Sequence, residues 1–260
     1  MKEYALDVWR HRHFWLSLVR LDLQARYRRS VLGIGWSLLS PIATTIVLCL
    51  AFYKIFNQPV REYAPFLLAG LAWWGYVTGA ISRGCQCFVE AEGYIRQHPL
   101  PMAVYPLRTA LGAMIHFLIA LTLVLLLTWC FKGFANLVAL PYLAIGLGIL
   151  LVFGWSVGVV AGYVNAVFRD IQHLTDIAFQ VLFYLTPVIY PADVLAQSGM
   201  SPVVRYNPLA HLLKIIRDPL VAGQVPSWRA YGVATASTFL AAAVAVLLLG
   251  RLQRKVVLYL

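Results

Sequence analysis

Residues 26–56 read RYRRSVLGIGWSLLSPIATTIVLCLAFYKIF and join a basic cluster to a long apolar run. The 21 residues from Trp36 to Phe56 carry one formal charge, on Lys54 near the far end. As a helix rising about 1.5 Å per residue, this run is about 32 Å long, which is enough to cross the hydrocarbon core of a bilayer. The stretch therefore predicts a membrane span that begins beside the arginines.

The segment before this span is basic and amphipathic. Arg26, Arg28 and Arg29 favour the cytoplasmic side for the first end of the span, because positive charge is retained inside. Residues 3–25 place apolar side chains at helical spacing, which predicts a helix lying in the membrane plane. An ordinary surface helix covering another part of the protein is the alternative. The glycines of Leu32-Gly33-Ile34-Gly35-Trp36 permit a sharp turn between the two segments.

The composition indicates an integral membrane protein. Hydrophobic residues make up 61% of the 260 residues and charged residues 12%, and the mean hydropathy is +0.76, which is too apolar for a soluble domain. The net charge of +11 would favour nucleic acid as a partner of a soluble protein. Here the basic residues flank apolar runs, so membrane orientation and anionic lipid explain them, and we expect no nucleic-acid partner.

Five further apolar intervals complete an expected all-α fold with six transmembrane helices and both termini in the cytoplasm. The interval 192–229 is strongly apolar but too interrupted to span, which favours re-entrant helices shielded by protein between the fifth and sixth spans. In this topology 14 Lys and Arg residues lie inside and seven outside, the expected bias, and four of the seven lie in the re-entrant interval. The remaining spans are expected at 65–82, 107–131, 137–164, a fifth ending within Tyr184–Pro191, and 231–250.

Three motifs give the chain a resemblance to a known family. The motifs are Arg26–Gly33 followed by Gly35–Pro41, then Phe168-Arg169-Asp170 with Tyr184–Pro191, and the apolar hairpin before the last span. Together they resemble the membrane subunits of ABC-2 type polysaccharide exporters, although Ser40 stands where asparagine is frequent before the proline. The resemblance implies a single transmembrane domain over 1–260, with an interface helix at 1–30, the six-span region at 31–250 and a cytoplasmic tail at 251–260.

The resemblance also implies the partners. It predicts a homodimer in the bacterial inner membrane that binds two copies of an ATPase subunit and exports an undecaprenyl-type lipid-linked polysaccharide, such as O-antigen or capsule. No phosphate-binding loop of the G-x-x-x-x-G-K-[ST] type occurs, so ATP and Mg would bind the partner subunit and this chain would need no cofactor. The sequence also offers no catalytic cluster and no closed metal site. An ABC-2 exporter of a small lipid or drug, or a membrane-embedded glycolipid enzyme, is the alternative.

Candidate residues for recognising a lipid pyrophosphate are those at the first turn: Arg26, Arg28, Arg29, Leu32 and Gly33. Guanidinium groups at headgroup level bind phosphate through charge-assisted, often bidentate contacts. Topology alone also explains these arginines.

Candidate wall residues of a glycan channel are aromatic, because the C–H faces of sugars stack on rings: Trp73, Trp74, Tyr76, Tyr184 and Tyr190. They occur near the expected outer halves of the second and fifth spans. The aromatic belts that form at membrane interfaces are the competing explanation.

Candidate coupling residues lie in two short intervals on the expected cytoplasmic side. In the resembled family such a loop docks the ATP-hydrolysing subunit, and the role is carried over to Glu90, Glu92, Tyr94, Arg96, Arg169 and Asp170. The alternative is that their charges only keep solvated loops out of the bilayer.

A glycine repeat in the fourth expected span predicts close helix packing. Gly154, Gly158 and Gly162 recur every four residues, a spacing that lets a second helix approach. Packing within the subunit and pairing between subunits are both compatible with this pattern. The four cysteines fall in or beside apolar segments, which favours buried thiols over disulfides or metal ligands.

Overall fold

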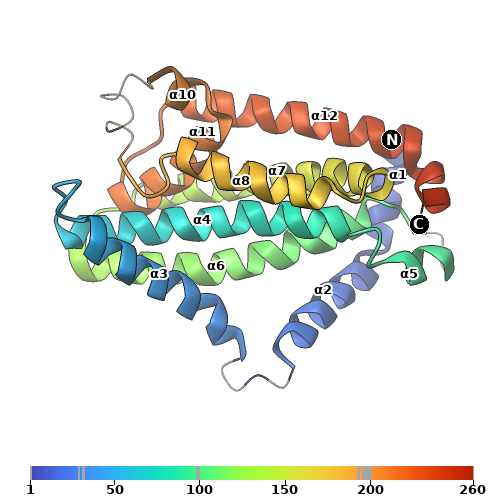
Figure 1. Ribbon diagram of the computed structural model, residues 1–260, viewed down its shortest axis with the longest axis horizontal. Helices are drawn as coiled ribbons and strands as arrows, with labels where there is room; N and C mark the ends of the chain where they lie inside the picture. Colours follow the sequence, from blue (N-terminus) through green and yellow to red (C-terminus); the bar gives the residue numbers. More distant parts are fainter. Residues whose placement is uncertain are drawn as a thin grey trace.

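The computed structural model describes residues 2–28, 30, 33–97, 100–191, 194 and 201–259, and within these ranges every regular element is helical (Figure 1). The all-α prediction is thereby confirmed for the described part of the chain. The elements are α1 (Lys2–Arg10), α2 (Arg12–Tyr27), a 3₁₀ turn (Gly33–Gly35), α3 (Trp36–Phe52), α4 (Val60–Gln86), α5 (Glu92–Gln97), α6 (Val104–Lys132), α7 (Leu140–Val167), α8 (Ile171–Leu185), α10 (Ser201–Tyr206), α11 (Pro208–Arg217), a π-helical turn (Asp218–Ala222) and α12 (Trp228–Tyr259).

Four of these helices are long and apolar enough to cross a bilayer: α4, α6, α7 and the Trp228–Arg251 part of α12. The helices at the other two predicted spans are shorter, since α3 has 17 residues and α8 has 15. The first span was expected to continue to Phe56, but α3 ends at Phe52 and a turn follows in which Asn57 has φ +50°. The expected tail at 251–260 is also helical as far as Tyr259, because α12 continues through it.

Proline determines where α8 ends. Thr186 has extended backbone angles, φ −109° and ψ 133°, because the ring of the following Pro187 disfavours the helical conformation at the residue before it. The prediction that the prolines of this segment end the fifth helix is therefore confirmed.

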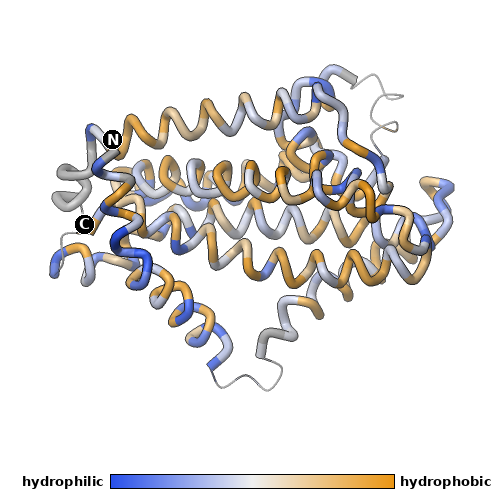
Figure 2. Tube along the Cα trace, turned by 180° about the vertical axis from the view of Figure 1, so that it is seen from behind, coloured by the Kyte–Doolittle hydropathy of each residue, from blue (hydrophilic) through white to orange (hydrophobic). Residues whose placement is uncertain are grey.

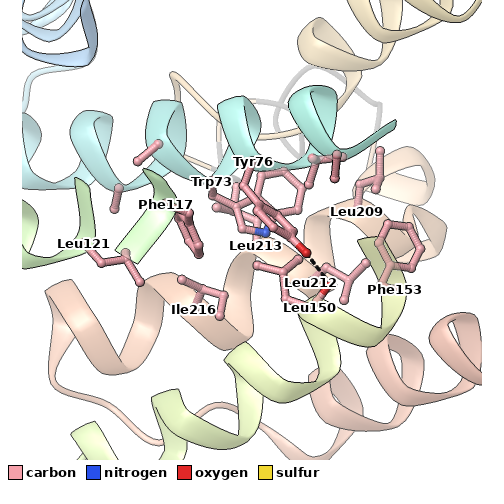
Figure 3. Packing of buried hydrophobic residues seen from close by; sticks show 14 of the residues in the cluster. Trp73, Tyr76, Phe117, Leu121, Leu150, Phe153, Leu209, Leu212, Leu213 and Ile216 are labelled. Carbon is pink, nitrogen blue, oxygen red and sulfur yellow. Dashed lines mark hydrogen bonds between the residues drawn. The ribbon is translucent and has the colours of Figure 1, made fainter. Parts of the chain in front are cut away.

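Helix α4 lies at the centre of the bundle and packs along both α6 and α7. Its buried face supplies Trp73 and Tyr76 to a core that also receives Phe117 from α6 and Leu150 from α7 (Figure 3). The Tyr76 hydroxyl donates a hydrogen bond to the Leu150 carbonyl oxygen at 3.0 Å, so the phenol joins α4 to α7 inside the core.

The glycine repeat of α7 faces α4 within the same chain. A Cβ on Gly84 of α4 would lie 2.6 Å from Gly158 Cα, and one on Gly162 would lie 2.8 Å from the Gly84 carbonyl oxygen. Both distances are shorter than side chains tolerate, so the crossing requires glycine on both helices. Packing within the subunit, one of the two predicted uses of the repeat, is what the structure has.

The two ends of the bundle are chemically distinct from its middle. Both termini lie at one end, beside α5, while α10 and α11 lie at the other (Figure 1). Hydrophobic residues dominate the middle of the long helices and hydrophilic residues gather at the ends (Figure 2). This distribution is the one a bilayer-spanning bundle requires.

Helix α11 is the most enclosed of the short helices, with seven of its ten residues buried against α12, α7 and α4. Asn207 is its N-cap: the side-chain oxygen accepts from the Leu209 amide at 2.9 Å. The side-chain nitrogen donates to the Leu185 carbonyl oxygen and to the Thr186 hydroxyl, at 3.2 and 3.0 Å. Asn207 therefore starts α11 and attaches it to the end of α8.

The N-terminal segment forms two helices instead of the single helix expected at 3–25, with a break at His11. Leu6, Trp9, Leu16 and Leu21 are about half exposed or more, at 56%, 62%, 49% and 53%. Leu18 of the same segment is buried, so only part of the apolar pattern is exposed, and a position of this segment in the membrane plane stays a prediction.

The cysteines divide between the core and the surface. Cys49, Cys85 and Cys87 are buried, as expected, whereas Cys130 is exposed.

Candidate functional site

A cavity of about 710 Å³ lies between α2, α3, α4 and α6. Three arginines from three different helices line it: Arg26 from α2, Arg83 from α4 and Arg108 from α6. Asp22 and Glu90 supply the carboxylates of the wall. We call this space the basic cavity.

The three guanidinium groups are not equally neutralised. Arg108 donates two hydrogen bonds to the carboxylate of Asp22, one from Nε and one from a terminal nitrogen. Arg83 donates from Nε to the Gly79 carbonyl oxygen of its own helix at 3.0 Å. Among the described residues neither Arg83 nor Arg26 forms an ion pair, and the two lie near enough to repel one another. With Asp22 and Glu90 counted against the three arginines, the cavity has an excess of one positive charge, and Arg26 and Arg83 have no ion-pair partner of their own among the described residues.

Most of the remaining wall of the basic cavity is apolar or small, with His116, Tyr76 and a few hydroxyl side chains as the polar exceptions. Trp36 stands at the start of α3 with 53% of its surface exposed, and Leu71, Gly75 and Phe117 belong to the inner wall. A ligand with an anionic group and an apolar body would match such a lining, since the anion would contact the arginines and the apolar body would contact the apolar wall.

A cluster of polar side chains lies beside the cavity, near the connection between α2 and α3. His116 Nδ1 lies 3.1 Å from the Tyr27 hydroxyl and 3.0 Å from the Ser37 hydroxyl. The two hydroxyls are also hydrogen-bonded to each other. Three helices therefore meet at this histidine, and the angle between α2 and α3 is fixed from α6.

The structure places only part of the predicted pyrophosphate set at the cavity. Arg26 lines it, whereas Arg28 is the exposed C-cap of α2. Gly33 has φ +51°, a left-handed angle that suits glycine, so the predicted sharp turn is confirmed there. Arg29 and Leu32 lie outside the described residues.

Arg83 and Arg108 are additions that sequence reasoning missed. Each stands near the end of an apolar run, where it resembles a residue that only sets topology. The meeting of these arginines depends on how three helices pack together, and no local sequence pattern predicts that.

The five predicted channel aromatics separate into three environments. Trp73 is fully buried in the core, so it has no ring face exposed to a channel, and its predicted role is not supported by its position. Tyr76 is also buried, although it contributes to the wall of the basic cavity. Trp74 and Tyr184 line a separate cavity of about 290 Å³ between α4 and α8, and Tyr190 donates a hydrogen bond to the Tyr184 carbonyl oxygen.

The predicted coupling residues occupy the end of the bundle that carries both termini. Helix α5 is attached through Ile95, which is buried with Phe88 and Ala91. Its outer face bears the ion pair of Glu92 with Arg96, whose nitrogen and oxygen are 2.8 Å apart.

The other coupling residues are accessible as well. Tyr94 is 40% exposed, and its ring lies in a T-shaped arrangement with that of Phe14, which connects α5 to α2. Glu90, Arg169 and Asp170 are exposed.

Helix α1 is attached at the same end. The Tyr4 hydroxyl accepts a hydrogen bond from the Ala103 amide at 3.0 Å, and burial raises the pKa of this phenol. The end of the bundle therefore has a packed base made of α1, α5 and the start of α6.

Comparison with known proteins identifies the family. Residues 13–221 match the ABC-2 type transporter family, and this range contains every residue named above for the basic cavity. The chain belongs to the ABC-2 type transporter family.

Curated relatives of this ABC-2 transporter are similar over most of both chains. It is 25% identical over 205 residues to the O-antigen export system permease protein RfbA of Klebsiella pneumoniae, with 78% of each chain covered. It is 26% identical over 210 residues to the RfbA protein of Myxococcus xanthus, with 80% of each covered. The polysialic acid transport protein KpsM of Escherichia coli is 22% identical over 208 residues, which cover 78% of this chain and 80% of KpsM.

Proposed function

We propose that this ABC-2 transporter is the membrane subunit of an ATP-driven exporter that moves a lipid-linked polysaccharide out of the bacterial cytoplasm. The observation that carries the proposal is the basic cavity, in which Arg26 and Arg83, neither of them ion-paired among the described residues, lie beside a largely apolar wall. Support also comes from the names of the relatives, which are O-antigen export permeases and a polysialic acid transport protein.

The lipid carrier would present its pyrophosphate to the basic cavity. A pyrophosphate on an undecaprenyl-type chain combines an anion with a long apolar body, and it lies at headgroup depth when the carrier is in the membrane. Arg26 and Arg83 would bind the phosphate oxygens through charge-assisted hydrogen bonds, and Arg28 would contact the anion on its approach from the surface. With this orientation α2 lies in the inner membrane interface and both termini are cytoplasmic.

Six spans per chain are few for a wide pathway, so we propose a homodimer. Helices α3 and α8, at the two short spans, expose large apolar side chains that lipid or a second subunit would cover. In α8 these include Leu174, Ile177 and Val181, which recur at helical spacing. The helices between the fifth and sixth spans would then be the re-entrant elements of the outer leaflet.

Two ATPase subunits would dock at the end formed by α5 and the turn at Arg169 and Asp170. Ion pairs and exposed aromatic residues on a packed base suit a protein contact, because the base transmits force to the helices it joins. Tyr94 is well placed for this role, since its contact with Phe14 leads to α2. ATP and Mg would be held by the partner.

A complementation experiment tests the proposal. Deletion of the gene should abolish the surface polysaccharide and leave lipid-linked glycan in the cytoplasmic leaflet, and the wild-type gene should restore export. Arg26→Gln/Arg83→Gln should fail to restore it while inserting normally, whereas Arg10→Gln/Arg20→Gln, with the same change of charge on residues outside the cavity, should succeed. Normal export by Arg26→Gln/Arg83→Gln would contradict recognition of the pyrophosphate by these two arginines.

A further inference from the structure

A second cationic cavity, of about 370 Å³, lies at the opposite end of the bundle from the termini, among α4, α10, α11 and the start of α12. Its described cationic wall residues are Arg205, Lys214, Arg217 and Arg229, and Asp218 is the one carboxylate among the described lining residues. We call this space the outer cavity. Its volume falls within the range of about 300–1,000 Å³ that is usual for small-molecule sites.

The positions of the four cations are opposite to the excess of Lys and Arg that the sequence places on the cytoplasmic side. With the orientation of the proposed function, they are the four basic residues of the external hairpin region, where a membrane protein has least reason to place positive charge. They come from α10, α11 and α12, yet the fold brings all four to one cavity. The orientation of the chain in the membrane does not explain these four basic residues, whereas a binding role would.

Arg217 gives the outer cavity a rigid, buried guanidinium. Its two terminal nitrogens donate to the carbonyl oxygens of Pro187 and Val188, both at 2.8 Å, and its plane lies over the Phe66 ring at 3.8 Å. The side chain is 8% exposed, and its buried Nε has no hydrogen-bond partner in the structure. Gly70 makes room for this arrangement, because a Cβ there would collide with the guanidinium.

The neighbouring charges are held weakly and remain available. Lys214 Nζ is 4.0 Å from the Asp218 carboxylate, the outer limit of an ion pair, and it is half exposed. Arg205 and Arg229 are exposed and form no ion pair among the residues that the structure describes. Among the residues that the structure describes at this cavity, four positive charges thus lie around one negative charge.

From this geometry we infer that the outer cavity is a binding site for a phosphate or pyrophosphate group. Arginine forks and a lysine ammonium are the groups that proteins use to hold phosphate oxygens. Here the exposed Arg205, Lys214 and Arg229 would supply those contacts, while Arg217, whose terminal nitrogens bind backbone carbonyls, would add a fixed positive charge. Phe66, Pro187 and Leu213 give the cavity an apolar side, which would accept the first carbons of a lipid that carries the phosphate. Placement on the external side rests on the proposed function. There the site would receive a phosphate-bearing headgroup after translocation.

Calorimetric titration of the purified chain in zwitterionic nanodiscs tests the inference, with inorganic pyrophosphate and farnesyl pyrophosphate as probes. The test variant is Lys214→Gln/Arg229→Gln, both exposed and peripheral to the core. The matched control is Lys54→Gln/Arg61→Gln, which removes the same charge at the same end of the bundle but outside the cavity. Both are made in the Arg26→Gln/Arg83→Gln background, so that the basic cavity does not mask the result.

The test variant should weaken binding at least about tenfold relative to the control, since charge-assisted hydrogen bonds are lost. Equal affinities of the test and control variants would overturn the inference. Farnesyl pyrophosphate binding more tightly than pyrophosphate would support the site with a lipid headgroup as its ligand, and equal binding of the two probes would support it with free phosphate groups. Comparing the Arg26→Gln/Arg83→Gln background with the wild type reports on the basic cavity alone. The proposed function and the outer binding site can therefore each be contradicted without the other.

Discussion

Replacing Gly84 by alanine should separate α4 from α7 and destabilise the bundle. The new Cβ would lie 2.6 Å from Gly158 Cα and 3.2 Å from the Gly158 carbonyl oxygen. Carbon atoms pack best at about 3.5–4.0 Å, so the helices must move apart by about 1 Å at the crossing. Both obstructing atoms are backbone, and no rotamer change relieves the contact.

The expected loss in the free energy of unfolding is the difference between the cost of overpacking and the gain in helix propensity. Overpacking of this kind costs about 1–3 kcal/mol, while the better helix propensity of alanine returns up to about 1 kcal/mol. The rigid backbone contact favours the upper part of the range, which leaves a net loss of about 1–2 kcal/mol. For a chain of this size that loss lowers the melting temperature by about 2–8 °C.

Thermal unfolding in detergent, followed by intrinsic tryptophan fluorescence, measures the effect. Gly148→Ala is the matched control, because it lies on α7 and its new Cβ meets nothing within 4 Å. If Gly84→Ala melts at or above the temperature of Gly148→Ala, the close crossing of α4 and α7 is wrong.

Three further changes test other parts of the structure. Tyr27→Phe removes the hydroxyl shared by α2, α3 and α6 and should destabilise the chain by about 0.5–1.5 kcal/mol in the same melting assay, whereas Tyr53→Phe should not. Asn207→Ala deletes the N-cap of α11 and should cost about 1–2 kcal/mol, seen as faster hydrogen exchange confined to α11; unchanged exchange there would contradict the capping role. Arg83→Gln should weaken the apparent affinity for lipid-linked glycan about tenfold, and an equal effect of Arg20→Gln would show that only general charge matters.

The helical fold could be predicted from hydropathy because a bilayer accepts few alternatives to apolar helices. Proline and glycine added local detail: Pro187 marked the end of α8, and Gly33 marked the turn before α3. The start of α3 at Trp36 was predicted, but its end at Phe52 and the break at His11 were not, because they depend on turns and packing that hydropathy does not report.

The candidate site was only partly readable from sequence. Arg26 could be selected because it lies in a local cluster, but Arg83 stands alone in the sequence and reaches the cavity because α4 packs against α6, which also packs against α2. The same limit explains why Trp73 and Trp74 could not be told apart. Both are tryptophan and they are adjacent in the sequence, but Trp73 points into the core and Trp74 points toward α8. Depth in the membrane follows from sequence, whereas the direction in which a side chain points requires the tertiary structure.

The most direct test of the export function is co-purification of this chain from native membranes, followed by measurement of ATP hydrolysis with and without lipid-linked polysaccharide. We expect an ATPase subunit to co-purify, and its hydrolysis to rise on addition of the glycan in the wild type but not in Arg26→Gln/Arg83→Gln. A chain that purifies alone and converts a glycolipid without ATP would contradict the exporter function and indicate an enzyme instead.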